Sequence, residues 1–320
     1  MNVAHLSETF PGKDWETIAP DEVGLDNAVL EAAADAVFEI ETRYGFLVVK
    51  QGRVVFERYK RDVTATNHIF SATKGLGATL IGIAEQQGLL RTRDRIADWL
   101  PVHHPDIAPD AEIRHVLNMT AGTDPSGSRW AYNSNFILNS LTGILGLASG
   151  MPPVRFYEEY LKQPLQLGFD WPSNNKGWIQ IGSQGPLPVI EATHRDIARM
   201  GLLWMHGGRW REQQLMAQEF VEEALTSPYP KANAAYGYLW WLNCDTGTWR
   251  STAGRSGTGR WFPFMPDNVF VALGARGKVM IVVPDHELIM VSMGDTAQEK
   301  SANYLGTMMH RVARICGYET

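Results

Sequence analysis

The sequence of 320 residues is poor in cysteine and has no excess of basic charge, and each shortage excludes a class of protein. Its two cysteines, Cys244 and Cys316, are too few for a disulfide framework or a cysteine-rich zinc site. The 29 Lys and Arg residues against 35 Asp and Glu residues give a net charge of −6, whereas nucleic-acid binding usually needs a basic face. We therefore expect neither a metal nor a nucleic-acid partner.

Long apolar runs and nucleotide-binding glycine loops are also missing. The longest apolar stretch, residues 137–150, contains Asn139 and Thr142 and is too short to span a bilayer. Residues 1–15 carry charges among scattered apolar positions, unlike a signal peptide. No Gly-x-Ser-x-Gly elbow, His-Glu-x-x-His pair, phosphate-binding loop or dinucleotide fingerprint is present. We expect a soluble cytoplasmic protein without membrane partner or cofactor, and the sequence leaves its oligomeric state open.

The composition that remains is that of a globular protein, with 44% apolar residues and 11 Trp, 12 Phe and 10 Tyr. Strand-like segments occur near both ends of the chain, and helix-like patterns dominate from Ser71 to about Leu225. The expected elements are a helix at Leu25–Tyr44 capped by Asp26, strands at Gly45–Lys50, Arg53–Tyr59, Val269–Leu273, Val279–Val283 and Leu288–Met293, and a helix at Ser301–Cys316.

This order predicts an α/β (α+β) fold in which one antiparallel sheet is built from both ends of the chain and flanked by helices. Residues 1–61 and 231–320 would form the sheet domain, and residues 62–230 an all-helical domain. The two would make one catalytic unit, because a cleft forms naturally where two such parts meet.

The first candidate for chemistry is Ser71-Ala72-Thr73-Lys74. A serine three residues before a lysine lies on the same side of a helix as that lysine. If the helix begins at Ser71, its free N–H groups can stabilise an oxyanion. A buried Lys74 would lose hydration of its charge, its pKa would fall, and it could then accept the serine proton.

The same spacing occurs a second time, at Ser173 and Lys176, and its context is different. Ser173 lies in a loop rich in Asn and Gly, whereas Ser71 opens a helix with an apolar stripe. Gly75, Gly77 and Gly82 inside that helix each cost about 1 kcal/mol relative to Ala, which indicates close packing against neighbouring backbone. We therefore assign the nucleophile to Ser71.

The second candidate is Tyr132-Asn133-Ser134, which follows a glycine-containing loop. A tyrosine beside a lysine can accept or relay a proton, and the Ser134 hydroxyl can hold that lysine or a substrate carbonyl. The sequence does not decide whether Lys74 or Tyr132 is the primary base.

The third candidate is residues 272–277, Ala-Leu-Gly-Ala-Arg-Gly, at the start of the last strand pair. A strand edge with Gly274 lets the backbone approach a substrate closely, and the N–H of Ala275 could complete an oxyanion hole with that of Ser71. The tryptophans Trp240 and Trp241 precede this segment and are candidates for lining an apolar pocket.

Together, Ser71-x-x-Lys74, Tyr132-x-Ser134 and the later glycine-containing strand resemble the three motifs of the serine β-lactamase and penicillin-binding-protein superfamily. Residues 113–122 resemble the stretch before the tyrosine motif in class C-like members. Residues 193–201 and 236–241 are similar to stretches of 6-aminohexanoate-dimer hydrolases and family VIII carboxylesterases. The resemblance implies a β-lactamase-like fold and a serine hydrolase that forms an acyl-enzyme.

The third motif departs from that family. β-Lactamases carry Lys or His, then Thr or Ser, then Gly, whereas this sequence has Ala272-Leu273-Gly274; Ser134 also replaces the more usual Asn. The missing cation favours small esters or linear amides over β-lactams. The alternatives that remain open are an acyltransferase, a true β-lactamase or D-aminopeptidase, and a catalytically silent penicillin-binding-like sensor.

Overall fold

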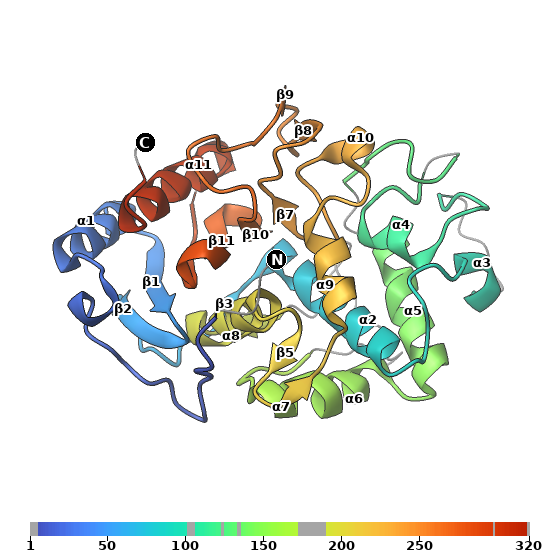
Figure 1. Ribbon diagram of the computed structural model, residues 1–320, viewed down its shortest axis with the longest axis horizontal. Coiled ribbons are helices and arrows are strands. Elements are labelled where there is room, and N and C mark those ends of the chain that lie inside the picture. Colours follow the sequence, from blue (N-terminus) through green and yellow to red (C-terminus); the bar gives the residue numbers. More distant parts are fainter. Residues whose placement is uncertain are drawn as a thin grey trace.

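The computed structural model describes residues 6–100, 106–122, 125–132, 136–171, 190–296 and 298–318. Strands from both ends of the chain form one six-stranded antiparallel sheet in the order β2-β1-β12-β11-β10-β7, which confirms the expected α/β fold (Figure 1). These strands are β1 (Arg43–Lys50), β2 (Arg53–Tyr59), β7 (Trp241–Leu242), β10 (Phe270–Gly274), β11 (Lys278–Val283) and β12 (Leu288–Gly294).

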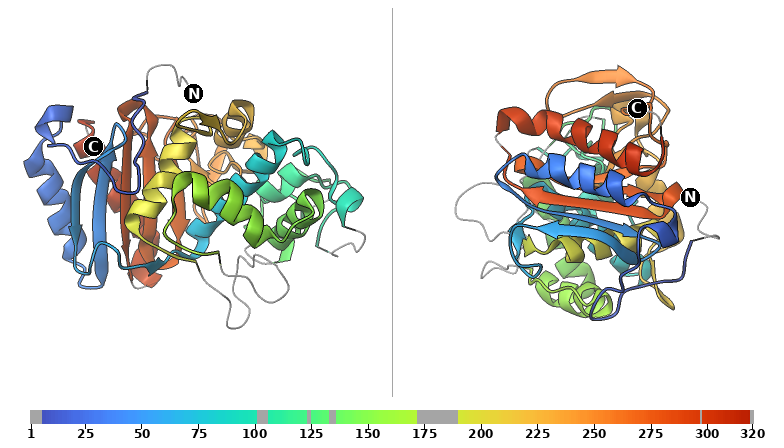
Figure 2. Two further views of the ribbon diagram at one scale, coloured as in Figure 1. Left: turned by 90° about the horizontal axis from the view of Figure 1, so that it is seen from below. Right: turned by 90° about the vertical axis from the view of Figure 1, so that its left-hand side faces the viewer.

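Helices cover both faces of this sheet. Helices α1 (Asn27–Phe38) and α11 (Gln298–Ile315) lie on one face, and α8 (His194–Met205) lies on the other (Figure 2). Every residue of β11 and β12 is buried as a result, so apolar side chains occupy both faces of these strands, with Lys278 and Ser292 as buried polar residues. The β1–β2 hairpin turns at Gln51 and Gly52, which both have positive φ as a two-residue hairpin turn requires.

The remaining helices lie beyond the β10–β7 edge of the sheet, around the central helix α2 (Thr73–Gln86) (Figure 1). Most of α2 is buried, and a Cβ at Gly75 would lie 2.7 Å from the Trp240 ring, so the close packing expected of this helix is confirmed. The other helices are α3 (Ile96–Trp99), α4 (Ile113–Leu117), α5 (Phe136–Ser149), α6 (Pro153–Tyr157), α7 (Gln163–Leu165), α9 (Gln218–Leu225) and α10 (Pro230–Asn233).

Short two-stranded antiparallel ribbons also occur outside the six-stranded sheet. They pair β3 (Asn67–His68) with β4 (Glu191–Ala192), β5 (Arg209–Trp210) with β6 (Gln213–Gln214), and β8 (Thr248–Arg250) with β9 (Ser256–Thr258). The β3–β4 ribbon matters for the site, because it anchors the chain three residues before Ser71.

The first helix is shorter than the sequence predicts. Asp26 caps it as expected, accepting a 2.7 Å hydrogen bond from Ala28 N, but the helix ends at Phe38 and not at Tyr44. Arg43 and Tyr44 instead begin β1, where Arg43 is buried and donates to Ser292 Oγ on β12 at 2.8 Å. Sheet pairing outweighs the helical spacing of the apolar residues at this boundary.

Helix α8 packs against β1, β11 and β12, although its residues fall in the segment assigned to the helical domain. The division at residues 61 and 231 therefore stays a prediction, with α8 as the helix that joins the two parts.

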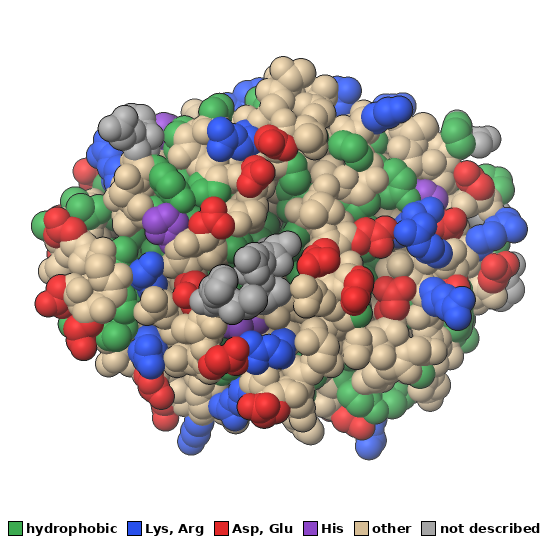
Figure 3. All heavy atoms as spheres, in the orientation of Figure 1, with side chains coloured by type: hydrophobic (Ala, Val, Ile, Leu, Met, Phe, Trp, Pro, Cys, Tyr) green, Lys and Arg blue, Asp and Glu red, His purple; other side chains and the backbone are tan. Residues whose placement is uncertain are grey.

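Within the described parts of the chain, no single helix is long and apolar enough to cross a membrane. The bent pair 137–149 and 153–165 has sufficient length and apolar composition, a property it shares with core helices. Both cysteines are free. Acidic and basic side chains are interspersed over the face shown in Figure 3, and no basic patch is seen on it.

Candidate active site

Ser71 lies in a tight turn that the neighbouring backbone holds firmly. The 3-10 turn η3 (Phe70–Ala72) carries Ser71, and α2 begins two residues later than the sequence predicts, at Thr73. Ile69 N donates to Ile190 O at 3.1 Å, and Phe70 N donates to the His68 ring at 3.0 Å. Phe70 has φ 48°, a left-handed conformation that costs a non-glycine residue about 1–2 kcal/mol. Such strain is typical of functional sites and fixes the direction of the following side chain.

Lys74 contacts Ser71 from the first turn of α2. Its Nζ lies 2.7 Å from Ser71 Oγ, and the lysine side chain is almost fully buried. No carboxylate pairs with Lys74 in the part of the chain that the structure describes, so burial lowers its pKa to about 7. Near neutral pH a large share of Lys74 is therefore a neutral amine, which can accept the proton of Ser71.

Tyr132 faces the same pair. Its side chain forms a hydrogen bond with Ser71, and its ring centroid lies 4.9 Å from Lys74 Nζ. Burial raises the pKa of Tyr132, and the Ser71 hydrogen bond offsets this rise only in part. The loop that carries Tyr132 is fixed by a 3.0 Å hydrogen bond from Ala131 N to Met119 O. The structure thus brings Ser71, Lys74 and Tyr132 together.

Gly274 ends β10 directly against the turn that carries Ser71. A Cβ at this position would lie 2.1 Å from Ile69 O, so only glycine permits the approach. The next residue, Ala275, begins the 3-10 turn η5 (Ala275–Gly277). Ala275 therefore follows immediately on the residue that packs against Ile69, two residues before Ser71. Ala272, on the same strand, is buried.

The two candidate tryptophans have different surroundings. Trp240 is 1% exposed and packs between Gly75, Trp204 and Phe270. It is therefore a core residue that packs against α2. Trp241 is 5% exposed and stacks on the Tyr132 ring, with centroids 5.9 Å apart and planes 22° apart. We keep Trp241 in the site and assign Trp240 to the core. Ser134 lies outside the described residues.

Two aromatic residues near Tyr132 were not among the candidates from sequence. The Trp130 ring lies 5.9 Å from Tyr132, and the Tyr236 ring lies edge-on at 6.3 Å. Tyr236 is fully buried, and its hydroxyl has no hydrogen-bond partner among the residues described. Together with Trp241 these rings pack around Tyr132, and burial raises its pKa. Only tertiary packing brings Tyr236 to Tyr132, although both tyrosines belong to recognisable sequence stretches.

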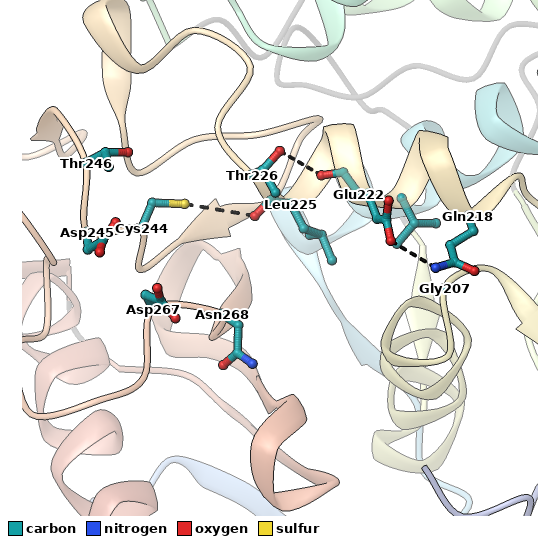
Figure 4. Close-up of a pocket in the computed structure, with 11 residues that line it drawn as sticks. Gly207, Gln218, Glu222, Leu225, Thr226, Cys244, Asp245, Thr246, Asp267 and Asn268 are labelled. Atoms are coloured by element: carbon teal, nitrogen blue, oxygen red, sulfur yellow. Dashed lines mark hydrogen bonds between the residues drawn. The ribbon is translucent and has the colours of Figure 1, made fainter. Parts of the chain in front are cut away.

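A separate cavity of about 220 Å³ lies between the end of α9 and the segments that contain Cys244 and Asp267 (Figure 4). Cys244 Sγ points toward Leu225 O at 3.9 Å, and burial raises the pKa of this thiol to about 11. Ser71, Lys74 and Tyr132 do not line this cavity, so it is not the candidate active site. Searched over the described ranges, the chain holds no cluster of His, Cys, Asp and Glu suited to a metal ion.

Comparison with known proteins identifies the family and the fold of the chain. The family model for Beta-lactamase matches residues 44–312. An uncharacterised protein of Alkalihalophilus pseudofirmus is 23% identical over 267 residues, which cover 74% of this chain and 76% of that protein.

Solved structures of low sequence identity share the fold. A protein of Bacillus anthracis named as a 6-aminohexanoate-dimer hydrolase has a TM-score of 0.69 at 15% identity, over 98% of this chain and 89% of its own. EstCE1, described as a hydrolase with promiscuous acyltransferase activity, has a TM-score of 0.64 at 12% identity, over 89% of this chain and 98% of its own. At these identities the likeness shows the fold alone.

Proposed function

Because the chain belongs to the beta-lactamase family, we propose that it is a serine hydrolase that acts on small esters or linear amides through an acyl-enzyme. The observation that carries the proposal is the 2.7 Å contact between Ser71 Oγ and the buried Nζ of Lys74. A serine is a weak nucleophile by itself, and an adjacent base with a pKa near neutrality activates it. A capping serine with a solvent-exposed lysine would not have this geometry.

In the first step the neutral Lys74 amine takes the Ser71 proton while Ser71 Oγ attacks the substrate carbonyl. The N–H groups of Ser71 and Ala275 would hold the oxyanion that forms, since Gly274, the residue before Ala275, packs against Ile69 beside the Ser71 turn. Loss of the leaving group gives the acyl-enzyme, which water then hydrolyses by the same steps.

Tyr132 would carry the proton to the leaving group. Its pKa is raised by burial, so at neutral pH it is a phenol and not a phenolate. A phenol that is hydrogen-bonded to Ser71 can donate its proton to the departing oxygen or nitrogen and be reprotonated by the Lys74 ammonium. This division makes Lys74 the primary base and Tyr132 the relay.

The substrate preference follows from positions 272 and 278, on the two strands that pair at Gly274. Position 272 is a buried alanine, and Lys278, opposite Gly274 in the sheet, donates to Asp295. Lys278 is therefore engaged and does not serve as the fixed cation that holds the carboxylate of a β-lactam. We expect esters and linear amides to be good substrates and penicillins poor ones, and one solved structure of this fold is named as a hydrolase of a linear amide, the 6-aminohexanoate dimer.

Fluorophosphonate labelling tests the nucleophile. The wild-type protein should gain the mass of one phosphonyl group, and Ser71→Ala should gain none. Ser173→Ala is the matched control, because Ser173 has the same spacing to a lysine, and it should label fully. Labelling lost in the control and kept in Ser71→Ala would overturn the assignment. A folded wild-type protein that does not label would point to the silent sensor.

A substrate panel tests the preference. We expect p-nitrophenyl acetate and short linear amides to be turned over in a Ser71-dependent way, with nitrocefin far slower. Nitrocefin as the best substrate by a wide margin would identify a true β-lactamase instead. Gas chromatography of the products with added alcohol would reveal an acyltransferase, because transfer and hydrolysis share the acyl-enzyme and differ only in the acceptor.

A further inference from the structure

Four aromatic rings contact one another in succession from the candidate active site to the β8–β9 ribbon. We call Tyr132, Trp241, Trp261 and Trp249 the aromatic row. Tyr132 stacks on Trp241 at 5.9 Å, Trp241 contacts Trp261 at 5.4 Å, and Trp261 stacks on Trp249 at 5.6 Å with planes 19° apart.

The row is held in place and is partly open to solvent. Tyr132, Trp261 and Trp249 are each half-buried, whereas Trp241 between them is buried. In β9, a Cβ at Gly257 would lie 2.7 Å from the Trp249 ring, so this glycine lets Trp249 lie flat across the ribbon. The half-exposed rings of Tyr132, Trp261 and Trp249 thus lie on either side of the buried Trp241, and exposed aromatic surface beside a site is typical of ligand binding.

The role of Tyr132 in the proposed reaction indicates which part of the substrate would contact the aromatic row. In the function proposed above, Tyr132 donates its proton to the leaving oxygen or nitrogen. A group attached to that atom therefore begins next to Tyr132, and the row extends from Tyr132 in the direction of Trp261 and Trp249. The acyl group is instead attached to Ser71 and lies beside the N–H groups of Ser71 and Ala275.

Resting on that function, we propose that the aromatic row is a subsite for a flat ring in the alcohol or amine part of the substrate. Ring faces stack favourably on Trp and Tyr in offset or tilted arrangements, and a puckered alicyclic ring of the same size does not stack in this way. Since the group that leaves and the group that enters share one subsite, aromatic alcohols are also the preferred acyl acceptors.

A matched pair of esters tests the subsite. Benzyl acetate and cyclohexylmethyl acetate release alcohols with the same number of carbons and similar reactivity, but only the first carries a flat ring. We expect kcat/KM to favour benzyl acetate by about 3- to 10-fold, the range that ring stacking supplies. Trp261→Leu should reduce this ratio to about one, and Trp261→Phe, which keeps a flat ring, should retain most of it.

Trp99→Leu is the control, because Trp99 is a half-buried tryptophan of α3, at the far right of Figure 1. It should leave the ratio and the absolute rates as in the wild type. A wild-type ratio near one, or a ratio that Trp261→Leu leaves unchanged, would overturn the proposal while esters are still hydrolysed. Failure of all esters together with absent labelling of Ser71 would instead overturn the proposed function. Each variant is checked for folding by its melting temperature.

Discussion

Two lysines near the Ser71 turn have almost the same burial and opposite surroundings. Lys74 is 2% exposed and Lys278 is 3% exposed, and each Nζ lies 4.9 Å from an aromatic centroid, that of Tyr132 or of Phe70. Lys278 donates to the Asp295 carboxylate, whereas Lys74 has only the Ser71 hydroxyl within hydrogen-bond distance in the described structure. Burial lowers the pKa of both, and Asp295 offsets that effect for Lys278 alone.

The carboxylate partner therefore distinguishes the lysine that forms an ion pair from the lysine that we propose as the base. A carboxylate beside a buried ammonium stabilises the charged form, so the lysine stays protonated and serves as an ion pair. Without a carboxylate the neutral amine is favoured, and a lysine becomes a base at neutral pH. Hydrogen bonds from Lys278 and Tyr44 in turn lower the pKa of Asp295, although its partial burial alone would raise it.

The largest expected effect separates the two lysines by activity. Lys74→Met should lower kcat/KM for p-nitrophenyl acetate by at least about 10³-fold, because the nucleophile and its base act as one unit. Lys278→Met should lower kcat/KM by less than about tenfold, since Lys278 donates to Asp295 and has no hydrogen bond to Ser71 in the described part of the structure. Steady-state kinetics of both purified variants measure the contrast.

Fluorophosphonate labelling of the same variants locates the defect. Lys74→Met should label much more slowly than the wild type, and Lys278→Met at a similar rate. Equal losses in both variants would mean that the two lysines act through the shape of the site and that Lys74 is not the base.

The second effect concerns pH. Because Lys74 must be neutral to accept the Ser71 proton and its pKa is about 7, kcat/KM should fall about tenfold per unit below pH 7 and level off above it. This acidic limb of the pH–rate profile should lie at the same pH in Lys278→Met. A pH–rate profile between pH 5 and 9 checks this. A limb that moves with Lys278→Met, or one that lies near pH 10, would show that another group limits the rate.

Of the two lysines, the sequence alone marks Lys74 as a candidate and gives no indication of the role of Lys278. Ser71, Lys74 and Tyr132 could be assigned because local spacing and a known pattern mark them, and the strands could be assigned from their β-branched runs. The pairing of Lys278 with Asp295 depends on how β11 lies beside β12, which residue spacing does not reveal. The left-handed φ of Phe70 is equally absent from the sequence pattern, because the residue type does not indicate it and the neighbouring β3 pairs with a strand far away in the sequence.

The smallest effect separates the two lysines by stability, and in opposite directions. The pKa of Lys74 falls from about 10.4 in the unfolded chain to about 7, so burying its charge costs stability fully below pH 7. The unfolded state binds more protons than the folded state between these values, and stability therefore rises with pH across this window. Lys74→Met removes the cost and should stabilise the protein at pH 7 by about 1–2 kcal/mol, or about 2–4 °C in Tm.

Lys278→Met should instead lower Tm by a similar amount, because it leaves the partly buried Asp295 carboxylate without its main partner. Thermal unfolding of both variants at pH 6, 7 and 9 checks the pair. The gain in Lys74→Met should shrink toward pH 9, since the cost of deprotonating the wild-type lysine on folding falls as the pH approaches 10.4. A gain that is constant from pH 6 to 9 would mean that it comes from apolar packing of the new methionine. A loss of stability in Lys74→Met would show that the Lys74–Ser71 contact stabilises the fold and would remove the distinction between the two lysines.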